Sequence, residues 1–339
     1  MWCLKGWCTN CGQRFTPKVN LGTDIVGKQR FGTNLTSLVC LLREEFLQPL
    51  GKIQNYLKLV YGLTLSEGTL VRFLHTASTL GTTSYGEIKE KIRRAEVVHA
   101  DETGGRENGR NGYKWNFNTK KVQLLLYRHS RSAKVVSEVL GSEDDKDSFQ
   151  GVLITDFLGS YNVYQGFHQR CLVHLLRDIH KLKEEHPKSK KVRLWAESVE
   201  QIYQEAKSYT GPSPNLKPGE QAKERVEKEA YFKEKLTVIC EPLVTRNVPQ
   251  SVLCARIITF MSELFTFVRF PGVDSDNNSA ERAVRHAVLQ RKISGGTRSV
   301  KGSDTQSVLG SLFGTWRLQG LNPLEQTKLL LAGVPCPGI

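Results

Sequence analysis

Two aspartates in this chain stand where short apolar runs end. Asp101 follows the run at 97–100, Asp156 follows the run at 152–155, and turn-forming residues come soon after each. A charge at the exit of a strand is costly unless it meets water, a metal ion or a cation. Because ligands gather at the carboxyl ends of strands in α/β sheets, these carboxylates could share a pair of divalent ions such as Mg²⁺. Either aspartate alone could equally begin a turn or cap a helix.

A third carboxylate, Glu281, falls in the first turn of a predicted helix. Asp-Asn-Asn-Ser at 276–279 can open that helix, and apolar residues then recur at the i, i+3, i+4, i+7 and i+8 positions. A first-turn glutamate is ordinary helix-dipole chemistry, and Arg285, one turn later, could simply pair with it. Glu281 therefore carries chemical meaning only together with other acids.

A Cys-x-x-His pair, Cys171 and His174, follows the second aspartate. Two ligands alone cannot hold a zinc ion, and such a pair on a helix is more often a buried thiol and a partly exposed imidazole. Basic residues on the same predicted helix would bring it close to phosphate; they are Arg170, Arg177, His180 and Lys181. We interpret His174 as a support of an active site or a DNA contact, and Arg177 as a DNA contact.

The elements that would position these residues are predicted by changes of hydrophobic period. Residues 35–80 favour helices with a turn near Gly62, which suits a helix-turn-helix whose second helix presents Thr69, Arg72 and His75 outward. Any helical hairpin gives the same pattern. From residue 95 the pattern indicates strands and one helix, so the predicted fold class is α/β. The helical stretch that begins at residue 171 interrupts this α/β part and is interpreted as an insertion.

The composition is that of a basic globular protein. Lys and Arg total 48 against 34 Asp and Glu, a formal charge of +14, and 39% of residues are hydrophobic. These values exclude a wholly disordered, collagen-like or coiled-coil chain and suggest a polyanionic partner, although a basic surface kept for solubility would look the same. Because no apolar run reaches ~18 residues and the N-terminus does not resemble a signal peptide, we expect a cytoplasmic protein whose cysteines are thiols or metal ligands.

Four blocks appear in order along the chain and resemble a known family. They are His-Ala-Asp-Glu-Thr-Gly at 99–104, Leu-Ile-Thr-Asp-Phe at 153–157, Cys-Leu-Val-His-Leu-Leu-Arg at 171–177 and Asp-Asn-Asn-Ser-Ala-Glu-Arg-Ala-Val-Arg at 276–285. Together they resemble the DDE transposases of the insertion sequence 66 family, from residue 1 to about residue 330. The Asp-Asn-Asn-x-x-Glu-Arg block is the most specific of the four.

The resemblance implies a ribonuclease H-like catalytic core, with one acid on the first strand, one on the neighbouring fourth strand and one on a later helix. Carried over residue by residue, these are Asp101, Asp156 and Glu281, which would hold two Mg²⁺ or Mn²⁺ ions. The ions would clamp the attacking and leaving oxygens of an in-line displacement, so one site could nick the element ends and join them to a target. Element ends and target would both be double-stranded DNA, bound by a homo-oligomer at the nucleoid, with or without accessory proteins, and no membrane partner is expected.

The N-terminal Cys8-x-x-Cys11 pair resembles half of a zinc knuckle. The family usually carries a zinc-finger module with two such pairs ahead of a helix-turn-helix, whereas here one pair is complete and Cys3 lies nearby. Structural zinc takes four ligands. Either Cys3 and another residue complete a Zn²⁺ site, or the chain lacks the upstream half of the module, which is the interpretation we favour.

We predict four segments. They are a partial zinc-binding segment at 1–34, a helix-turn-helix-like DNA-binding domain at 35–94, the catalytic core at 95–290 with a helical insertion at about 187–270, and a basic loop and C-terminal helical region at 291–339. The predicted DNA contacts are Arg72, His174, Arg177, Arg282, Arg285, Arg291, Lys292, Arg298 and Lys301. A nuclease without strand transfer, a non-catalytic DNA-binding regulator and an inactive or truncated copy remain alternatives.

Overall fold

The computed structural model describes residues 6–7, 9–15, 31–142 and 145–334. The first of these residues form a small antiparallel pair of strands, β1 (Gly6–Trp7) and β2 (Arg14–Phe15). Cys11, in the turn between the two strands, is exposed. Cys3 and Cys8, the other cysteines of the predicted zinc segment, lie outside the described residues.

The helices that precede the main sheet show the predicted turn signals. They are α1 (Thr33–Glu44), α2 (Leu50–Tyr61), α3 (Glu67–Leu80) and α4 (Thr82–Arg93). Gly62 ends α2 with a φ of 66°, and the side chain of Ser66 caps α3 by accepting a hydrogen bond from the Thr69 N–H. Arg72 is exposed on α3 as predicted. His75 is not directed outward, because its Nδ1 lies 2.7 Å from the hydroxyl of Thr305.

The centre of the molecule is a five-stranded mixed sheet in the order β5-β4-β3-β6-β7. Its strands are β3 (Val97–Glu107), β4 (Arg110–Asn118), β5 (Gln123–Arg128), β6 (Val152–Thr155) and β7 (His168–Arg170). The first three form an antiparallel meander, whereas β6 pairs parallel with β3 and β7 pairs parallel with β6. Helix α5 (Ala133–Leu140) connects the meander to β6. The predicted α/β class is confirmed.

Strand β3 is longer than predicted. It continues past Asp101 to Glu107, and the turn into β4 is made by Asn108 and Gly109, which both have positive φ. Gly104 and Gly105, which were interpreted as turn residues after Asp101, instead lie within the strand. At Gly105 a Cβ atom would come within 3.1 Å of the Tyr127 ring. The glycines therefore allow close packing inside the sheet rather than ending the strand.

A helix closes the open edge of the sheet at β5. This helix is α12 (Val300–Leu318), and it carries Ser307, Ser311 and Thr315 one turn apart on the side that faces β5. Their hydroxyls accept hydrogen bonds of 2.7–3.2 Å from alternate backbone N–H groups of the strand. The chain then ends in α13 (Pro323–Leu331). The otherwise unpaired donors of an edge strand are thus satisfied by side chains of a helix.

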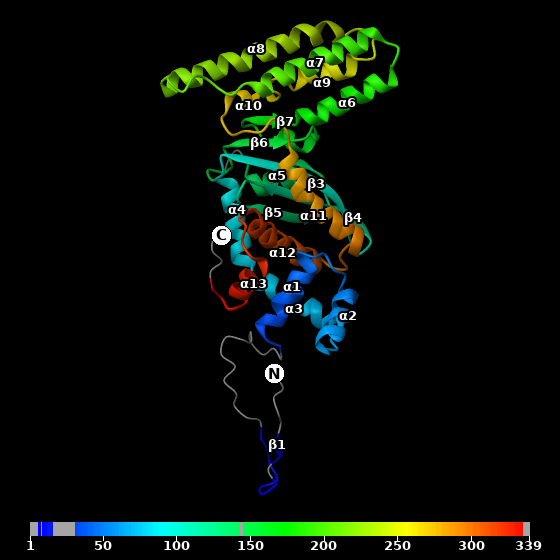
Figure 1. Cartoon of the computed structure of the whole chain (residues 1–339), viewed down its shortest axis with the longest axis vertical. Helices are drawn as coiled ribbons and strands as arrows, with labels where there is room; N and C mark the ends of the chain where they lie inside the picture. The colour runs from blue at the N-terminus through cyan, green and yellow to red at the C-terminus, as the bar shows by residue number, and fades with distance from the viewer. Residues whose placement is uncertain (1–5, 8, 16–30, 143–144, 335–339) are drawn as a thin grey trace.

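The helical insertion has an apolar core of its own. Its helices are α6 (Leu172–Glu185), α7 (Lys190–Ser208), α8 (Pro218–Val244), α9 (Ser251–Thr259) and α10 (Thr266–Arg269). Figure 1 shows them at one end of the molecule, with the sheet in the middle and α1, α3, α12 and α13 toward the other end. Within the predicted helical insertion, the apolar stretch at 252–267 is not one helix but is broken near Phe260 into α9, a 3₁₀ turn (Met261–Glu263) and α10. The break directs Glu263 toward the sheet, where it forms ion pairs.

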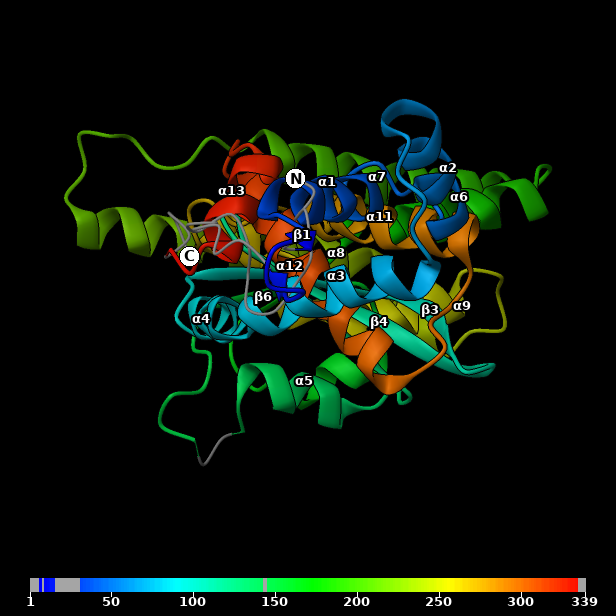
Figure 2. The ribbon, with the colours of Figure 1, turned by 90° about the horizontal axis from the view of Figure 1, so that it is seen from below.

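Helices flank the sheet on more than one side. In Figure 2, α5 lies on the opposite side of the molecule from α1 and α13. Helix α11 (Asn278–Ser294) packs against β3 and β4. Among the described residues no single helix is both long and apolar enough to cross a membrane; only the bent pair of 251–259 and 261–269 meets that test by length and composition.

Candidate active site

The register of two neighbouring strands brings Asp101 and Asp156 together. β3 and β6 run parallel, with His99 opposite Ile154. Continued by two residues, this register brings Asp156 alongside Asp101, and Asp156 acts electrostatically on Asp101. The prediction placed Asp101 at the end of a strand, whereas it lies inside β3. It nevertheless lies just beyond the part of β3 that pairs with β6. Both aspartates therefore stand at the carboxyl end of the parallel pair.

Each aspartate is fixed by a hydrogen bond to the backbone. Oδ1 of Asp101 accepts from the Glu102 N–H at 2.9 Å, and Oδ1 of Asp156 accepts from the Leu158 N–H at 2.9 Å. Burial raises the pKa of Asp101 to about 7, with further contributions from repulsion by Glu102, Asp156 and Glu281. Glu281 therefore lies near enough to act electrostatically on the first acid, although the two are far apart in the sequence.

Asn277 ties the start of α11, the helix that carries Glu281, to β3. This residue is buried, and its Nδ2 donates to the carbonyl oxygen of Ala100 at 2.8 Å. Its Oδ1 lies 3.2 Å from Nδ1 of His99, and its backbone N–H donates to Sγ of Cys171 at 3.2 Å. One side chain thus links the third acid's helix to the strand of the first. The sequence showed Asn277 only as part of a motif, without this role.

Helix α6 brings a histidine and an arginine to Glu281. Nε2 of His174 lies 3.6 Å and Nη1 of Arg177 lies 3.5 Å from the same oxygen, Oε1. Glu281 pairs across to α6 and not with Arg285, which is exposed on its own helix. Nδ1 of His174 is buried and has no hydrogen-bond partner within the described residues. The structure therefore places His174 and Arg177, both predicted DNA contacts, directly beside the third acid.

Glu102 holds an arginine at the edge of the site. Its carboxylate is almost fully buried, and it accepts from the Tyr161 hydroxyl at 2.7 Å and from Nε of Arg131 at 2.9 Å. Arg131 in turn interacts electrostatically with Asp156. Sequence reasoning missed both Glu102 and Arg131, because they meet across the sheet and share no motif spacing.

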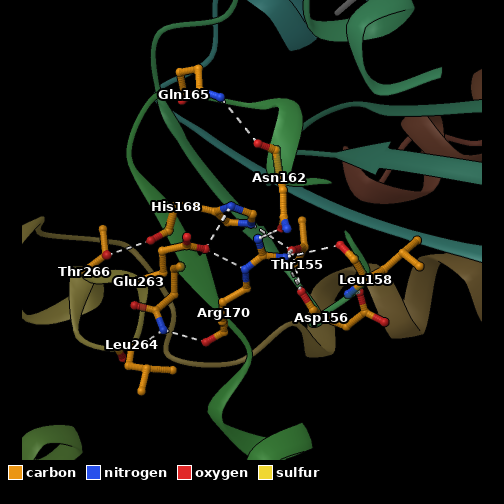
Figure 3. Close-up of polar contacts among 11 residues, drawn as sticks. Thr155, Asp156, Leu158, Asn162, Gln165, His168, Arg170, Glu263, Leu264 and Thr266 are labelled. Atoms are coloured by element: carbon orange, nitrogen blue, oxygen red, sulfur yellow. Dashed lines mark hydrogen bonds and ion pairs between the residues drawn. The ribbon is translucent and has the colours of Figure 1, made fainter. Parts of the chain in front are cut away.

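Arg170 fixes the loop that carries Asp156, as Figure 3 shows. Its guanidinium is fully buried, and it donates to the carbonyl oxygen of Asp156 at 2.9 Å and to Oε2 of Glu263 at 2.6 Å. His168, two residues earlier, lies 3.2 Å from the same glutamate oxygen and 2.8 Å from the Thr155 hydroxyl. Burial, together with the neighbouring Arg170, holds the pKa of His168 well below its usual value. The network joins the insertion to the strand that leads to Asp156.

A family model matches most of the chain. The model, described as Transposase IS66 family, matches residues 28–305. The chain belongs to the IS66 transposase family. The match includes all three acids and the helical insertion, and it begins after the N-terminal cysteines. No curated protein sequence matches the chain.

The three acids of this transposase-family chain form an all-oxygen donor set. Such ligands suit Mg²⁺ and Mn²⁺, and a bound cation would relieve the repulsion that contributes to the raised pKa of Asp101. In the arrangement described, however, no group of three or more His, Cys, Asp or Glu among the residues that the structure covers is placed to bind a metal ion. The donors fit these ions by their chemistry, while Oε1 of Glu281 is paired with His174 and Arg177 in this arrangement.

The remaining predicted DNA contacts lie on the surface, with one exception. Five of them are exposed on α11, on α12 or on the segment between these helices: Arg282, Arg285, Lys292, Arg298 and Lys301. Arg291 is half-buried, and its Nη1 donates to the carbonyl oxygen of Gly104, so it links α11 to β3. The basic loop that was predicted to begin at residue 291 is short, because α11 continues to Ser294 and α12 begins at Val300.

Proposed function

We propose that this chain binds the ends of its own insertion sequence and catalyses metal-dependent hydrolysis and strand transfer of DNA by a DDE mechanism. What supports the proposal is that Asp101 of β3 and Asp156, just after β6, stand at one end of a parallel strand pair, and that Glu281 of α11 acts electrostatically on Asp101. We also propose a ribonuclease H-like core. Its support is the sheet order, in which the first and fourth strands of the sheet are neighbours and lead to the two aspartates.

In this proposal the protein's own part is to hold and orient the reacting groups. Two Mg²⁺ or Mn²⁺ ions on the three carboxylates would supply the clamp on the attacking and leaving oxygens. Backbone N–H groups fix the two aspartate side chains, and Arg170 donates a hydrogen bond to the carbonyl oxygen of Asp156. Because the pKa of Asp101 is about 7, part of its carboxyl population carries a proton near neutral pH and would release it on binding a metal ion. Water or a DNA 3′-hydroxyl would attack, so the same residues serve cleavage and joining.

The proposed partner is double-stranded DNA, as element end and as target. Exposed Arg282 and Arg285 flank Glu281 on α11, and Arg72 is exposed on the second helix of the proposed helix-turn-helix, α2–α3. The net charge of +14 supports a polyanionic partner. Bringing two element ends together requires a homo-oligomer on DNA, and zinc binding by the N-terminal cysteines would belong to end recognition.

A cleavage and joining assay tests the proposal. The substrate is a labelled duplex that carries one element end and its flanking DNA, incubated with purified chain and Mg²⁺. We expect 3′-end nicking and joining by the wild type and a rate at least ~10²-fold lower for Glu281→Gln, because the variant lacks a ligand oxygen needed in the transition state. DNA affinity should change little. Glu184→Gln, an exposed glutamate on α6, is the matched control.

The outcomes separate the alternatives. Equal rates for Glu281→Gln and the wild type would remove Glu281 from the site. Nicking without any joined product would indicate a nuclease. Binding without cleavage in Mg²⁺ and in Mn²⁺ would indicate a DNA-binding regulator or an inactive copy.

A further inference from the structure

Arg131 connects the strand of the first acid to the loop of the second. Its Nε and Nη2 both donate to Oε1 of Glu102, the residue after Asp101. Its carbonyl oxygen accepts from the hydroxyl of Ser160, shortly after Asp156 along the chain. Arg131 also interacts electrostatically with Asp156. The positive charge of Arg131 therefore lies at the edge of the proposed site, between the strand that carries Asp101 and the loop that follows Asp156.

The guanidinium of Arg131 is oriented before any ligand arrives. Glu102 has only 2% of its side chain exposed, and the buried Tyr161 hydroxyl occupies its other oxygen at 2.7 Å. The guanidinium also lies over the ring of Tyr113, 5.7 Å from its centroid. A ligand that binds such a fixed side chain does not have to immobilise it, so less conformational entropy is lost on binding.

One edge of this guanidinium remains open. Nε and one side of Nη2 face Glu102, whereas Nη1 has no partner among the residues that the structure describes, and 45% of the side chain is exposed. The planar fork of arginine matches two oxygens of a phosphate. An open fork edge next to a cluster of carboxylates can receive a phosphate that those carboxylates alone would repel.

Arg128, three residues earlier, is paired in the same way but has no open edge. Nε and Nη2 of Arg128 donate to Glu138, and 41% of its side chain is exposed, close to the value for Arg131. Its Nη1, however, donates to the carbonyl oxygen of Tyr127 at 2.7 Å. All three nitrogens of Arg128 are used within the protein. The two arginines therefore differ in what they leave for a ligand.

We propose that the open edge of Arg131 binds a phosphate of the DNA strand that is cut, next to the scissile bond, and that Glu102 and Tyr161 are positioning residues for it. This inference rests on the proposed function, because it takes the site to be one that holds a DNA strand.

Neutral methylphosphonate linkages test the contact without requiring catalysis. The wild type, Arg131→Gln and the control Arg128→Gln bind element-end duplexes in the absence of divalent ions, with methylphosphonates placed singly around the cleavage point. We expect one linkage to weaken binding by the wild type and by Arg128→Gln about tenfold, and to have no further effect on Arg131→Gln, which has already lost the contact. The slope of log K against log salt should be smaller by about 0.9 for Arg131→Gln alone.

The inference is overturned if Arg131→Gln and Arg128→Gln lose the same DNA affinity at each methylphosphonate linkage and have the same salt slope. Arg131→Lys keeps the charge without the fork, so it should keep the salt slope; if Arg131→Gln does not fold, Arg131→Lys is compared in the methylphosphonate series alone, where its loss should be smaller than that of the wild type. Cleavage is measured on the same preparations with Mg²⁺. If the wild type shows the methylphosphonate effect but does not cleave, the phosphate contact stands and the proposed function fails.

Discussion

Three backbone carbonyl oxygens around the acids are bound by side chains from distant parts of the chain. Asn277 binds the carbonyl of Ala100, and Arg170 binds that of Asp156. Arg291 binds the carbonyl of Gly104, further along β3. A carbonyl held by a buried donor does not shift independently of that donor. The positions of the proposed catalytic groups thus depend on residues whose partners no sequence spacing reveals, which is why the acids could be singled out and their supports could not.

His168 should make the chain sensitive to acid. Because burial and Arg170 lower its pKa in the folded chain, the unfolded chain binds a proton below about pH 6.5 that the folded chain does not. The free energy of unfolding should therefore fall as the pH drops below that value, by up to about 1.36 kcal/mol per pH unit for this group. Urea denaturation at several pH values measures the slope.

The comparison between the wild type and His168→Gln uses the slope of the free energy of unfolding against pH and not the absolute stability. The variant should lose stability less steeply between neutral and mildly acidic pH. The same slope in both proteins would show that His168 gains its proton in the folded chain, with Glu263 as the counter-charge.

Among the elements, those set by local signals were predicted well. A helix ends at Gly62, where a turn was expected, and the strand before Asp156 ends where its apolar run ends. The errors have tertiary causes. β3 runs through its glycines because β4 pairs along its whole length and Tyr127 packs on Gly105. The apolar stretch at 252–267 has a helical pattern, but the ion pairs of Glu263 with the sheet accompany a break that the pattern does not show.

Loss of Glu263 should loosen the insertion from the sheet. Glu263→Ala leaves Arg170 buried without its carboxylate, and we expect the free energy of unfolding to fall by about 3 kcal/mol. Glu197→Ala, on the exposed face of α7, removes an ion pair with Arg193 and should cost less than ~1 kcal/mol. Urea denaturation followed by circular dichroism compares the two. A loss as small as that of the control would mean that the carbonyl oxygens around Arg170 satisfy it without Glu263.

Across the whole molecule, one helix connects parts that the sequence keeps apart. α12 contacts β5 of the sheet, and it also contacts α3 and α4 of the N-terminal helices. His75 of α3 meets Thr305 at the start of α12. The proposed DNA-reading helix and the sheet that carries the acids are therefore joined through α12, although the sequence suggested separate segments at 35–94 and 291–339.

Removing one hydroxyl from α12 should weaken this connection measurably. Thr315→Val keeps the shape of the side chain but leaves the backbone N–H of Gln123 without its acceptor, so we expect a loss of about 2 kcal/mol in the free energy of unfolding. Thr79→Val, at an exposed position of α3, should change it by less than ~0.5 kcal/mol. Thermal and urea unfolding report both. Equal stability of the two variants would show that water replaces the hydroxyl.

The hydroxyl row of α12 also decides how the chain behaves toward its own copies. A product that stops before residue 300 would uncover the N–H groups of β5, which are a template for strand addition by another molecule, and it would also lack the buried residues that α12 adds to the core. Such a product should collect as insoluble protein even if its acids are intact. We expect the soluble fraction of such a product to be smaller than that of the full chain, which sedimentation of the two products from the same expression would measure.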